Sequence, residues 1–381
     1  MVGAVAGEAA ERAAFEALLG LGSAPELAVL FASQHYWAEA EDLLGALTAA
    51  LGPVPLVGCT ADGVIGTGRE VEDEPAVSLW VAAGFPSPVE TFAVEYLGTP
   101  SGGIFAGHRF EAGGGAYLLF GDPFSFPVEQ LLEHLNANVP GALAVGGVAS
   151  GGLGRRRSEL FLDGAVLHEG AVGARLAGAR VDVAVDVWVS QGCRPVGSPF
   201  TVTKAEGHIV REMGGRPAYE RLEQLVAAVP ESVRKLLADG GLQFGIAMNE
   251  YRDSLGQDDF LVRSVLGADP ETGSVLIAGE VEVGTTVQFL ARDAVSADQD
   301  LELCLERESA RLAGRGPAGV LLFSCNGRGS RLFTDPDHDA AMVSKVLGPV
   351  PVAGFFAAGE LGPVGGKNFL HAFSASVVVL R

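Results

Sequence analysis

The side chains best suited to hold a small polar molecule lie close together near the C-terminus. Arg328 supplies a cation, Glu360 a carboxylate and Asn326 an amide, and Gly327 and Gly329 add accessible backbone N–H groups. A planar guanidinium fork pairs with carboxylates, and a carboxylate pairs with an ammonium group. This set predicts a site for a zwitterion such as an amino acid.

Two earlier segments carry polar side chains at positions that correspond to this C-terminal one. The segment near residues 33–62 offers hydroxyl, thiol and carboxylate groups, and the segment near residues 122–150 offers a carboxylate and a hydroxyl. The C-terminal segment itself adds the thiol of Cys325. From these segments the predicted ligand-binding residues are Ser33, Cys59, Thr60, Asp62, Cys325, Asn326, Gly327, Arg328, Gly359 and Glu360, with Gln34, His35, Asp122 and Ser150 as further candidates.

The candidates surround a nine-residue pattern, Gly-x-x-Ala-x-Gly-x-(Ile/Leu)-Gly. It occurs at Gly58–Gly66, Gly146–Gly154 and Gly354–Gly362. Glycines at fixed offsets indicate positive φ or a close approach of the backbone to something else. Two interpretations stay open, tight packing of a turn against a strand or a cradle for a ligand. The spacing matches neither the dinucleotide nor the P-loop fingerprint, so the sequence predicts no NAD, ATP or other cofactor.

Each copy of the pattern follows a lead-in of Leu, Phe and a small residue, with the phenylalanine 26 to 31 residues upstream of the first glycine. A short apolar run, a helical segment and a second apolar run precede each pattern. The predicted strands and helices of the three copies are 27–31, 37–51 and 54–57; 117–120, 128–136 and 142–145; 320–323, 339–347 and 350–353, with later strands at 76–82, 160–167, 181–189 and 372–380.

This order predicts an α/β fold of internally repeated strand-helix-strand units with added antiparallel strands, mixed sheets and two domains. Ligands of open α/β sheets bind beyond the carboxyl ends of parallel strands, so we expect the candidate residues to share such an edge. The segment between copies two and three differs, with a helix near 217–227 and strands near 244–248, 260–266 and 275–281, and a degenerate fourth copy is one interpretation of it. The predicted parts are an N-terminal helix at 1–25 and domains at 26–215 and 216–381, divided at a Gly/Pro-rich turn.

Composition narrows the class of function. The 381 residues have a hydrophobic content of 48% and a net charge of −21, from 26 basic and 47 acidic side chains. This balance predicts neither nucleic acid nor a membrane surface as a partner. Four cysteines without paired spacing and an alanine- and glutamate-rich start without a basic signal region indicate a cytoplasmic protein with reduced thiols.

Several candidates have a structural alternative. Cys59 and Cys325 suit small buried core positions, and Arg328 could instead pair with Asp337 or Asp339 on the surface. The aspartates at 335, 337 and 339 suit helix capping better than a metal site, so no metal is predicted. A thiol enzyme is the alternative function, in which Cys325 attacks an acyl or amide substrate with His338 or His371 as base.

The chain resembles a known family at several motifs. Phe31–Ser33, Pro53–Gly63, Gly215–Tyr219, Phe323–Gly329 and Gly354–Glu360 are similar to segments of the paired FIST N and FIST C domains. The resemblance implies a sensory module of bacterial signalling proteins that binds a small molecule, with amino acids suggested as ligands. Such modules are often fused to output domains, for which this chain has no room, so a separate signalling output protein is the expected partner.

Overall fold

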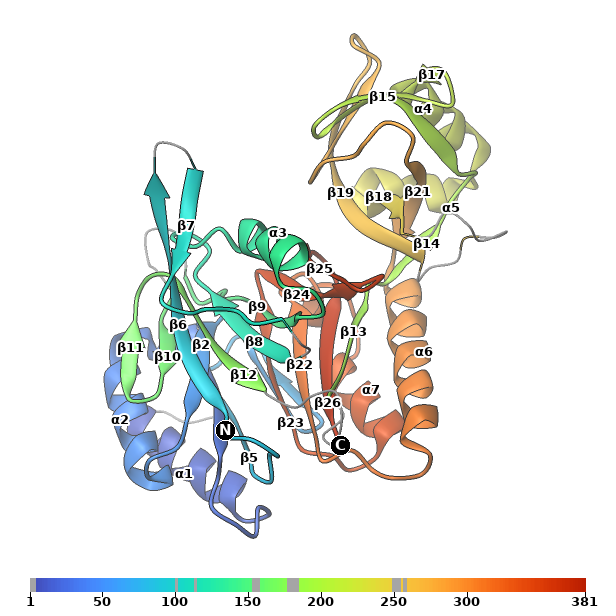
Figure 1. Ribbon diagram of the computed structural model, residues 1–381. Coiled ribbons are helices and arrows are strands. Elements are labelled where there is room, and N and C mark those ends of the chain that lie inside the picture. The colour runs from blue at the N-terminus through green and yellow to red at the C-terminus, as the bar shows by residue number, and fades with distance from the viewer. Residues whose placement is uncertain are drawn as a thin grey trace. The chain divides into compact units, whose positions relative to one another are not determined.

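A computed structural model describes residues 5–99, 102–112, 115–152, 158–176, 185–248, 255 and 259–381. The chain forms two compact units (Figure 1). Met1–Val189 and Cys304–Arg381 make the first, and Ser190–Leu303 make the second. The predicted boundary near residue 215 lies within the second unit, and the last part of the chain returns to the first unit.

The first unit contains three mixed sheets, each built on a parallel strand pair, and this confirms the predicted α/β fold of repeated units. The parallel pairs are β1 with β2, β8 with β9, and β22 with β23. Their bounds are β1 Leu27–Ser33, β2 Leu56–Ala61, β8 Ala116–Gly121, β9 Leu143–Val148, β22 Gly319–Cys325 and β23 Val352–Ala357, with the connecting helices η1 Gln34–Glu39, α2 Ala40–Leu51, α3 Val128–Asn138, η4 Gly329–Arg331 and α7 His338–Leu347.

The helix α2 illustrates why these connections are helical. Leu43, Leu44 and Leu47 recur at a spacing of three to four residues and are buried, so one stripe faces the core. Glu41 and Asp42 in the first turn favour the positive end of the helix dipole. The helix ends at Gly52, whose φ of 74° is readily adopted only by glycine.

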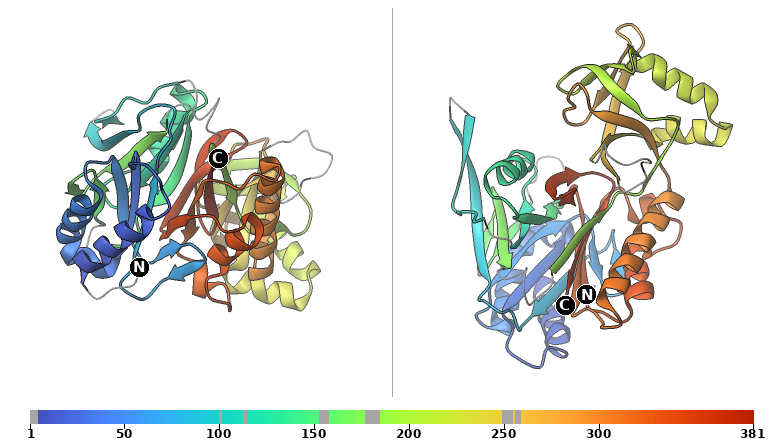
Figure 2. Two further views of the ribbon diagram at one scale, coloured as in Figure 1. Left: turned by 90° about the horizontal axis from the view of Figure 1, so that it is seen from below. Right: turned by 45° about the vertical axis from the view of Figure 1, so that its right-hand side comes forward.

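A hairpin that follows each parallel pair leaves its own sheet and joins the sheet of another copy. The hairpin β3–β4 of copy one pairs with β23, the hairpin β24–β25 of copy three pairs with β9, and the hairpin β10–β11 of copy two pairs with β2. The three exchanges close a ring in which every sheet is completed by a different copy. Figure 2 shows the sheets of the first unit from two further directions. The hairpin strands are β3 Val64–Gly66, β4 Arg69–Val71, β10 Leu160–Leu162, β11 Ala165–Leu167, β24 Gly359–Val364 and β25 Lys367–His371.

The glycine pattern begins inside the second parallel strand and not in the turn after it, which corrects the predicted placement. A Cβ atom on Gly58, Gly146 or Gly354 would lie 1.7, 2.1 or 1.7 Å from a carbonyl oxygen of the neighbouring strand. A contact this short is impossible for any side chain, so the first glycine of each copy permits close approach of the two strands. Gly154, the last residue of the second copy, lies outside the described residues.

The phenylalanines of the three lead-ins meet in the core of the first unit. Ring centroids of Phe31 and Phe120 are 5.3 Å apart, those of Phe31 and Phe323 6.0 Å, and those of Phe120 and Phe323 5.7 Å. Phe355 stacks on Phe31 at 4.8 Å. Edge-to-face pairs at these distances are favourable, and the equivalent residue of each copy thus helps to hold the three copies together.

The remaining elements of the first unit extend its sheets. The helix α1 packs on α2 and β5, β12 lies beside β8, β6 and β7 continue that sheet, and β13 and β26 continue the third sheet. Their bounds are α1 Ala6–Leu18, β5 Val77–Ala82, β6 Glu90–Thr99, β7 Gly102–Ala106, β12 Ala171–Leu176, β13 Val185–Ser190 and β26 Ala375–Leu380, and α6 Ala294–Leu312 runs from the second unit into the first.

The second unit is a closed antiparallel barrel, so the region between copies two and three is not a fourth copy. Its strands pair in the order β21, β15, β16, β20, β19 and β18, and β18 pairs again with β21. The bounds are β14 Cys193–Pro195, β15 Phe200–Glu206, β16 Ile209–Met213, β17 Arg216–Pro217, β18 Leu242–Ala247, β19 Phe260–Asp269, β20 Ser274–Ile277, β21 Thr286–Arg292, α4 Ala218–Ala228, α5 Glu231–Leu236 and η2 Leu237–Gly241.

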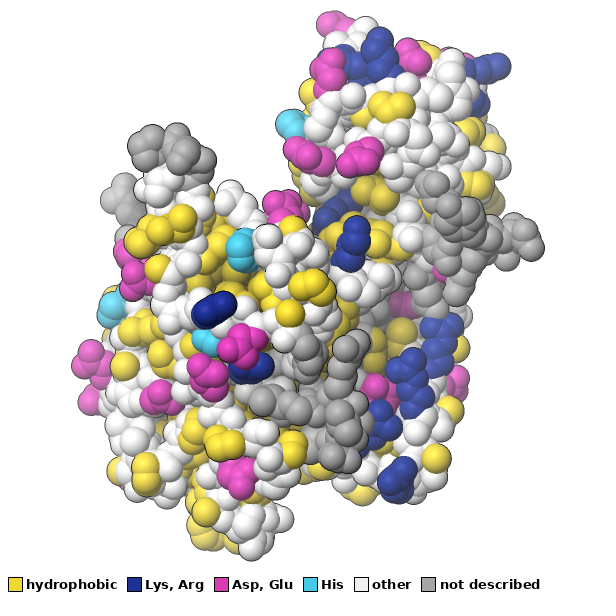
Figure 3. Space-filling view, in the orientation of Figure 1, with side chains coloured by type: hydrophobic (Ala, Val, Ile, Leu, Met, Phe, Trp, Pro, Cys, Tyr) yellow, Lys and Arg dark blue, Asp and Glu magenta, His cyan; other side chains and the backbone are white. Residues whose placement is uncertain are grey.

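Among the described helices, none has the length and apolar character needed to cross a membrane. On the face shown in Figure 3, acidic and basic side chains are interspersed with apolar ones.

Candidate functional site

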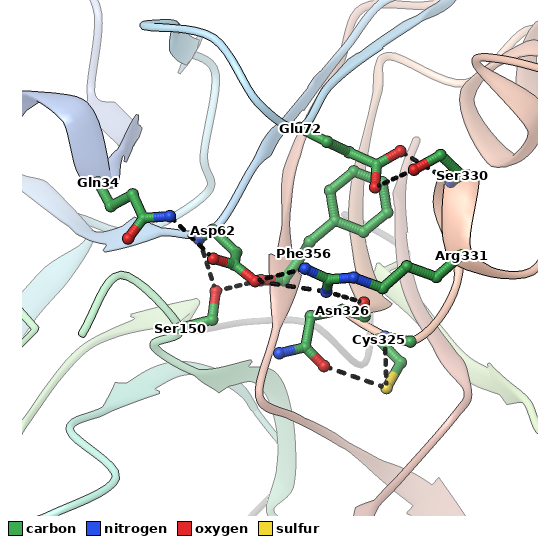
Figure 4. Close-up of polar contacts among 10 residues, drawn as sticks. Gln34, Asp62, Glu72, Ser150, Cys325, Asn326, Ser330, Arg331 and Phe356 are labelled. Atoms are coloured by element: carbon green, nitrogen blue, oxygen red, sulfur yellow. Dashed lines mark hydrogen bonds and ion pairs between the residues drawn. The ribbon is translucent and has the colours of Figure 1, made fainter. Parts of the chain in front are cut away.

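The carboxyl ends of the parallel strands bring polar groups from all three copies to Asp62, directly after β2 (Figure 4). The Asp62 Oδ1 accepts a hydrogen bond from Gln34 Nε2 at 3.0 Å, and its Oδ2 pairs with Arg331 Nη2 at 3.3 Å. The Asp62 N–H donates to Ser150 Oγ at 2.8 Å, and Ser150 Oγ donates to the carbonyl of Phe356. The expected convergence at a strand edge thus holds for these residues.

We call Gln34, Asp62, Ser150, Asn326 and Arg331 the central polar cluster. A cavity of about 10 Å³ lies against it, lined by Asp62, Gly63, Glu72, Asp73, Asn326, Arg331 and Phe356. This is about the room that one water molecule needs. Any larger guest must therefore displace a side chain. Arg331 is a candidate, because 56% of its side chain is exposed in its ion pair with Asp62.

Glu72 ties the hairpin β3–β4 of copy one to the loop that carries Arg331. Its two carboxylate oxygens accept hydrogen bonds from the N–H and the hydroxyl of Ser330 at 2.8 and 2.9 Å. Gly329 makes room for this contact, because a Cβ there would lie 2.7 Å from Glu72 Oε1, and its φ is 54°. Movement of Arg331 is thus linked through its neighbour Ser330 to the exchanged hairpin.

Arg328 pairs with Asp339, one of the two partners of its structural alternative, but the pair is buried and does not lie on the surface. Its Nε and Nη2 donate to the two oxygens of Asp339 at 2.8 and 2.7 Å, and both side chains are buried. Burial by itself would raise the pKa of Asp339, but the charge and hydrogen bonds of Arg328 outweigh burial and hold that pKa well below its usual range. The guanidinium fork is therefore occupied by an internal carboxylate and not by Glu360 or solvent.

Glu360 and Cys325 form a second buried group. Glu360 Oε2 accepts hydrogen bonds from the N–H and hydroxyl of Ser374 at 3.0 and 2.8 Å. Burial raises the pKa of Glu360 to about 8, against the opposing effect of the Ser374 hydrogen bonds. Burial, followed by the charge of Glu360, raises the pKa of Cys325 to about 12. Both groups are thus protonated at neutral pH.

This environment argues against Cys325 as a nucleophile, because the thiolate is the reactive form. The two histidines proposed as its base have other contacts. His338 stacks on Phe333 and its Nδ1 lies 2.9 Å from Asp339 Oδ1, while His371 Nε2 lies 3.1 Å from the carbonyl of Gly362. The Gly327 N–H points at Cys325 Sγ at 3.4 Å and not into an open oxyanion site.

Replacing Glu360 by glutamine should change how stability depends on pH. A carboxyl group with a raised folded-state pKa makes the folded state bind more protons than the unfolded one between about pH 4.3 and its folded pKa, so its contribution to stability falls as pH rises. We expect Glu360→Gln to become more stable relative to wild type from about pH 5 to about pH 8. Urea unfolding across that range measures the difference, and parallel curves would contradict the assigned protonation.

The other predicted residues serve the framework. The Ser33 hydroxyl accepts from the Ala76 N–H at 2.9 Å, and Thr60 Oγ1 accepts from the Glu159 N–H at 2.9 Å. Cys59 is fully buried in β2, and burial raises the pKa of its thiol. Gly359 lies in β24, where a Cβ would meet Leu370 at 2.9 Å. Of the ten predicted residues, Asp62 and Asn326 alone belong to the central polar cluster.

Sequence reasoning omitted Arg331 and Glu72. Arg331 lies three residues after Arg328 in the segment that the sequence had singled out. Glu72 belongs to the acidic stretch 70–74. In this stretch Glu70 Oε1 accepts a hydrogen bond from the Ala340 N–H at the start of α7 at 3.0 Å, and Glu72 binds Ser330.

Comparisons with known proteins agree with this architecture. The FIST N domain matches residues 26–216, and the FIST C domain matches residues 218–363. An uncharacterized protein of Mycobacterium tuberculosis is 48% identical over 372 residues, which cover 97% of this chain and 95% of that protein. An uncharacterized protein of Mycobacterium bovis is 48% identical over 359 residues, covering 94% and 91%. FIST domains are known as sensory domains, and with both of them matched along most of its length this chain belongs to the FIST family.

Proposed function

We propose that this protein is a cytoplasmic sensor that binds a small zwitterionic metabolite, such as a small amino acid, at the central polar cluster. The observation that carries the proposal is the position of Asp62, which contacts residues from all three copies at once. A ligand that changes the contacts of Asp62 therefore acts on the whole ring of exchanged hairpins. The family's known sensory role supports such a coupling.

The charges of the cluster fit a zwitterion. The Arg331 guanidinium lies 3.3 to 3.4 Å from Asp62 Oδ2, longer than the roughly 2.7 to 2.9 Å of a strong charge-assisted hydrogen bond. An exposed ion pair contributes only about 0 to 1 kcal/mol, so separating the two groups costs little. A ligand carboxylate would take the Arg331 fork, and its ammonium group would take the released Asp62 oxygen.

This exchange explains how binding would become a signal. Arg331 also donates to the carbonyl of Asn326, and its neighbour Ser330 is held by Glu72 of the exchanged hairpin. Drawing Arg331 toward a ligand moves the loop that touches this hairpin. The separate output protein would detect the hairpin or its surroundings, because binding shifts a conformational equilibrium only through such differential contacts.

Replacing Arg331 by alanine should weaken binding of small L-amino acids about tenfold or more, because the fork that receives their carboxylate is lost. Asp62→Asn should weaken it similarly by removing the charge that holds the ammonium group. Titration calorimetry of a panel of small amino acids measures both effects after a thermal-shift screen selects the ligand.

Arg216→Ala is the matched control for this test. Arg216 has the same exposed fraction of 56%, pairs with Glu220 at 3.1 Å, and lies in the second unit. Arg216→Ala should leave the affinity for the amino acid unchanged. A wild-type melting curve unmoved by every amino acid in the panel would contradict the proposed ligand class, and equal affinity in wild type and Arg331→Ala would remove the site from this cluster.

A further inference from the structure

A groove of about 720 Å³ runs along β5 in the first unit, away from the central polar cluster. We call it the β5 groove. One wall is the helix α1 and the turn after it, where Ala13 and Ala17 of the helix and Gly20 of the turn present little side-chain bulk. The other wall is the hairpin β3–β4, with Val64 and Val71. The groove is thus lined largely by small or apolar side chains.

At Leu79 and Val81 the strand β5 presents an open backbone edge to this groove. Among the described strands, β1 is the only one paired with β5, so β5 ends its sheet. Ser33 N–H bonds to the Ala76 carbonyl, and the alternation of antiparallel pairs then directs Ser78 and Trp80 toward β1. The backbone groups of Leu79 and Val81 therefore face away from β1.

This edge lacks the usual protection against pairing with other strands. Edge strands of monomers are commonly blunted by lysine, proline or a bulge, whereas Val77–Ala82 contains no charge and no proline and pairs with β1 without a break in register. Trp80 anchors the strand, because its ring fills the space that a Cβ on Gly319 would take. At Leu79 and Val81 the edge could therefore accept an additional strand.

The charges of the groove differ from those of the chain as a whole. Exposed Arg12 and Arg69 line it, although the net charge of the chain is −21. Arg12 pairs with Glu16 at 3.4 Å, and within the described part of the chain Arg69 has no ion-pair partner. An acidic side chain or a terminal carboxylate would complement this end of the groove.

We propose that the β5 groove binds an extended segment of a partner protein, with alternating apolar side chains and an acidic group, which adds a strand to β5. Main-chain hydrogen bonds supply affinity in this mode, and alternate side chains supply specificity. A second copy of this chain does not fit, because its own β5 lies between the same two walls. The hairpin β3–β4 lines this groove and, through Gly63 and Glu72 beside it, the central cavity, so one element touches both sites.

The test uses the full chain and a displayed library of random linear peptides. We expect it to enrich extended peptides that carry an acidic residue. Two N-methylated versions of such a peptide are compared, one methylated at odd and one at even positions. Only one of them should bind more weakly, by about tenfold or more, since only alternate N–H groups of the peptide face β5. Arg69→Glu, a substitution at an exposed position, should weaken binding of the unmethylated peptide by a similar factor. Hydrogen exchange should show new protection at Leu79 and Val81.

Ile104→Ser in β7, another exposed strand position, is the control and should leave peptide binding unchanged. Failure to enrich any peptide would overturn the proposal, as would insensitivity to N-methylation in both parities or protection that maps away from β5. If sedimentation showed a dimer and hydrogen exchange showed Leu79 and Val81 protected without peptide, a second copy would be the occupant, and this too would overturn the proposal. None of these outcomes depends on whether amino acids bind Asp62.

Discussion

Gly58→Ala is expected to destabilise the protein by about 3 kcal/mol or more, a large fraction of the stability of a typical folded chain. The new Cβ would lie 1.7 Å from the Leu30 carbonyl oxygen, and a backbone atom cannot move aside without separating β1 from β2. Urea unfolding followed by the fluorescence of buried Trp80 measures the loss.

Gly66→Ala is the control within the same copy of the pattern. A Cβ atom on Gly66 would have no neighbouring atom within 4 Å, and its φ is not positive, so alanine there should change stability by less than about 1 kcal/mol. Gly354→Ala should behave like Gly58→Ala, because the distance to its neighbouring strand is the same. Equal stability of the Gly58 and Gly66 variants would refute the close-approach explanation of the repeat.

Asp339→Ala should cost about 3 to 5 kcal/mol, because it leaves the Arg328 guanidinium buried without its carboxylate. Glu220→Ala, which breaks the exposed pair with Arg216, should cost only about 0 to 1 kcal/mol. The stabilising effect of Asp339 should persist at neutral pH and decline as pH falls below about 4 toward its lowered folded-state pKa.

A double substitution separates the ion pair from the packing around it. Arg328→Met with Asp339→Leu removes both charges while keeping apolar volume, and it should recover much of the stability lost in Asp339→Ala. Thermal and urea unfolding of the three variants measure this. If Asp339→Ala were no worse than Glu220→Ala, the pair would be solvated and Arg328 would again be available to a ligand.

Local sequence patterns predicted the repeated strands and helices well, because burial of one helix face or of a short strand depends on residues near one another. Thus α3 begins at Val128 as predicted, and β22 includes the predicted run 320–323. The hairpin exchange could not be predicted in this way. Pairing of Ile65 with Gly354 depends on contacts between distant segments, which no local period records.

The candidate site shows the same limit at the level of single side chains. The loop after β22 was identified, and Asp62 was placed correctly at a strand edge. The choice between Arg328 and Arg331 depends on the direction of each side chain, and this is set by buried Asp339 for one and by partly buried Asp62 for the other. Composition and spacing carry no information about such directions.

The exchange of hairpins also determines when each strand can pair during synthesis of the chain. Gly147 of β9 must wait for Glu360, and Ile65 of β3 must wait for Gly354, before their pairing partners exist. At about 5 to 20 residues per second, these edges remain open for roughly 10 to 60 s on the ribosome. During that interval the nascent chain carries unpaired apolar strands, and it depends on chaperones or on rapid completion to avoid association with its neighbours.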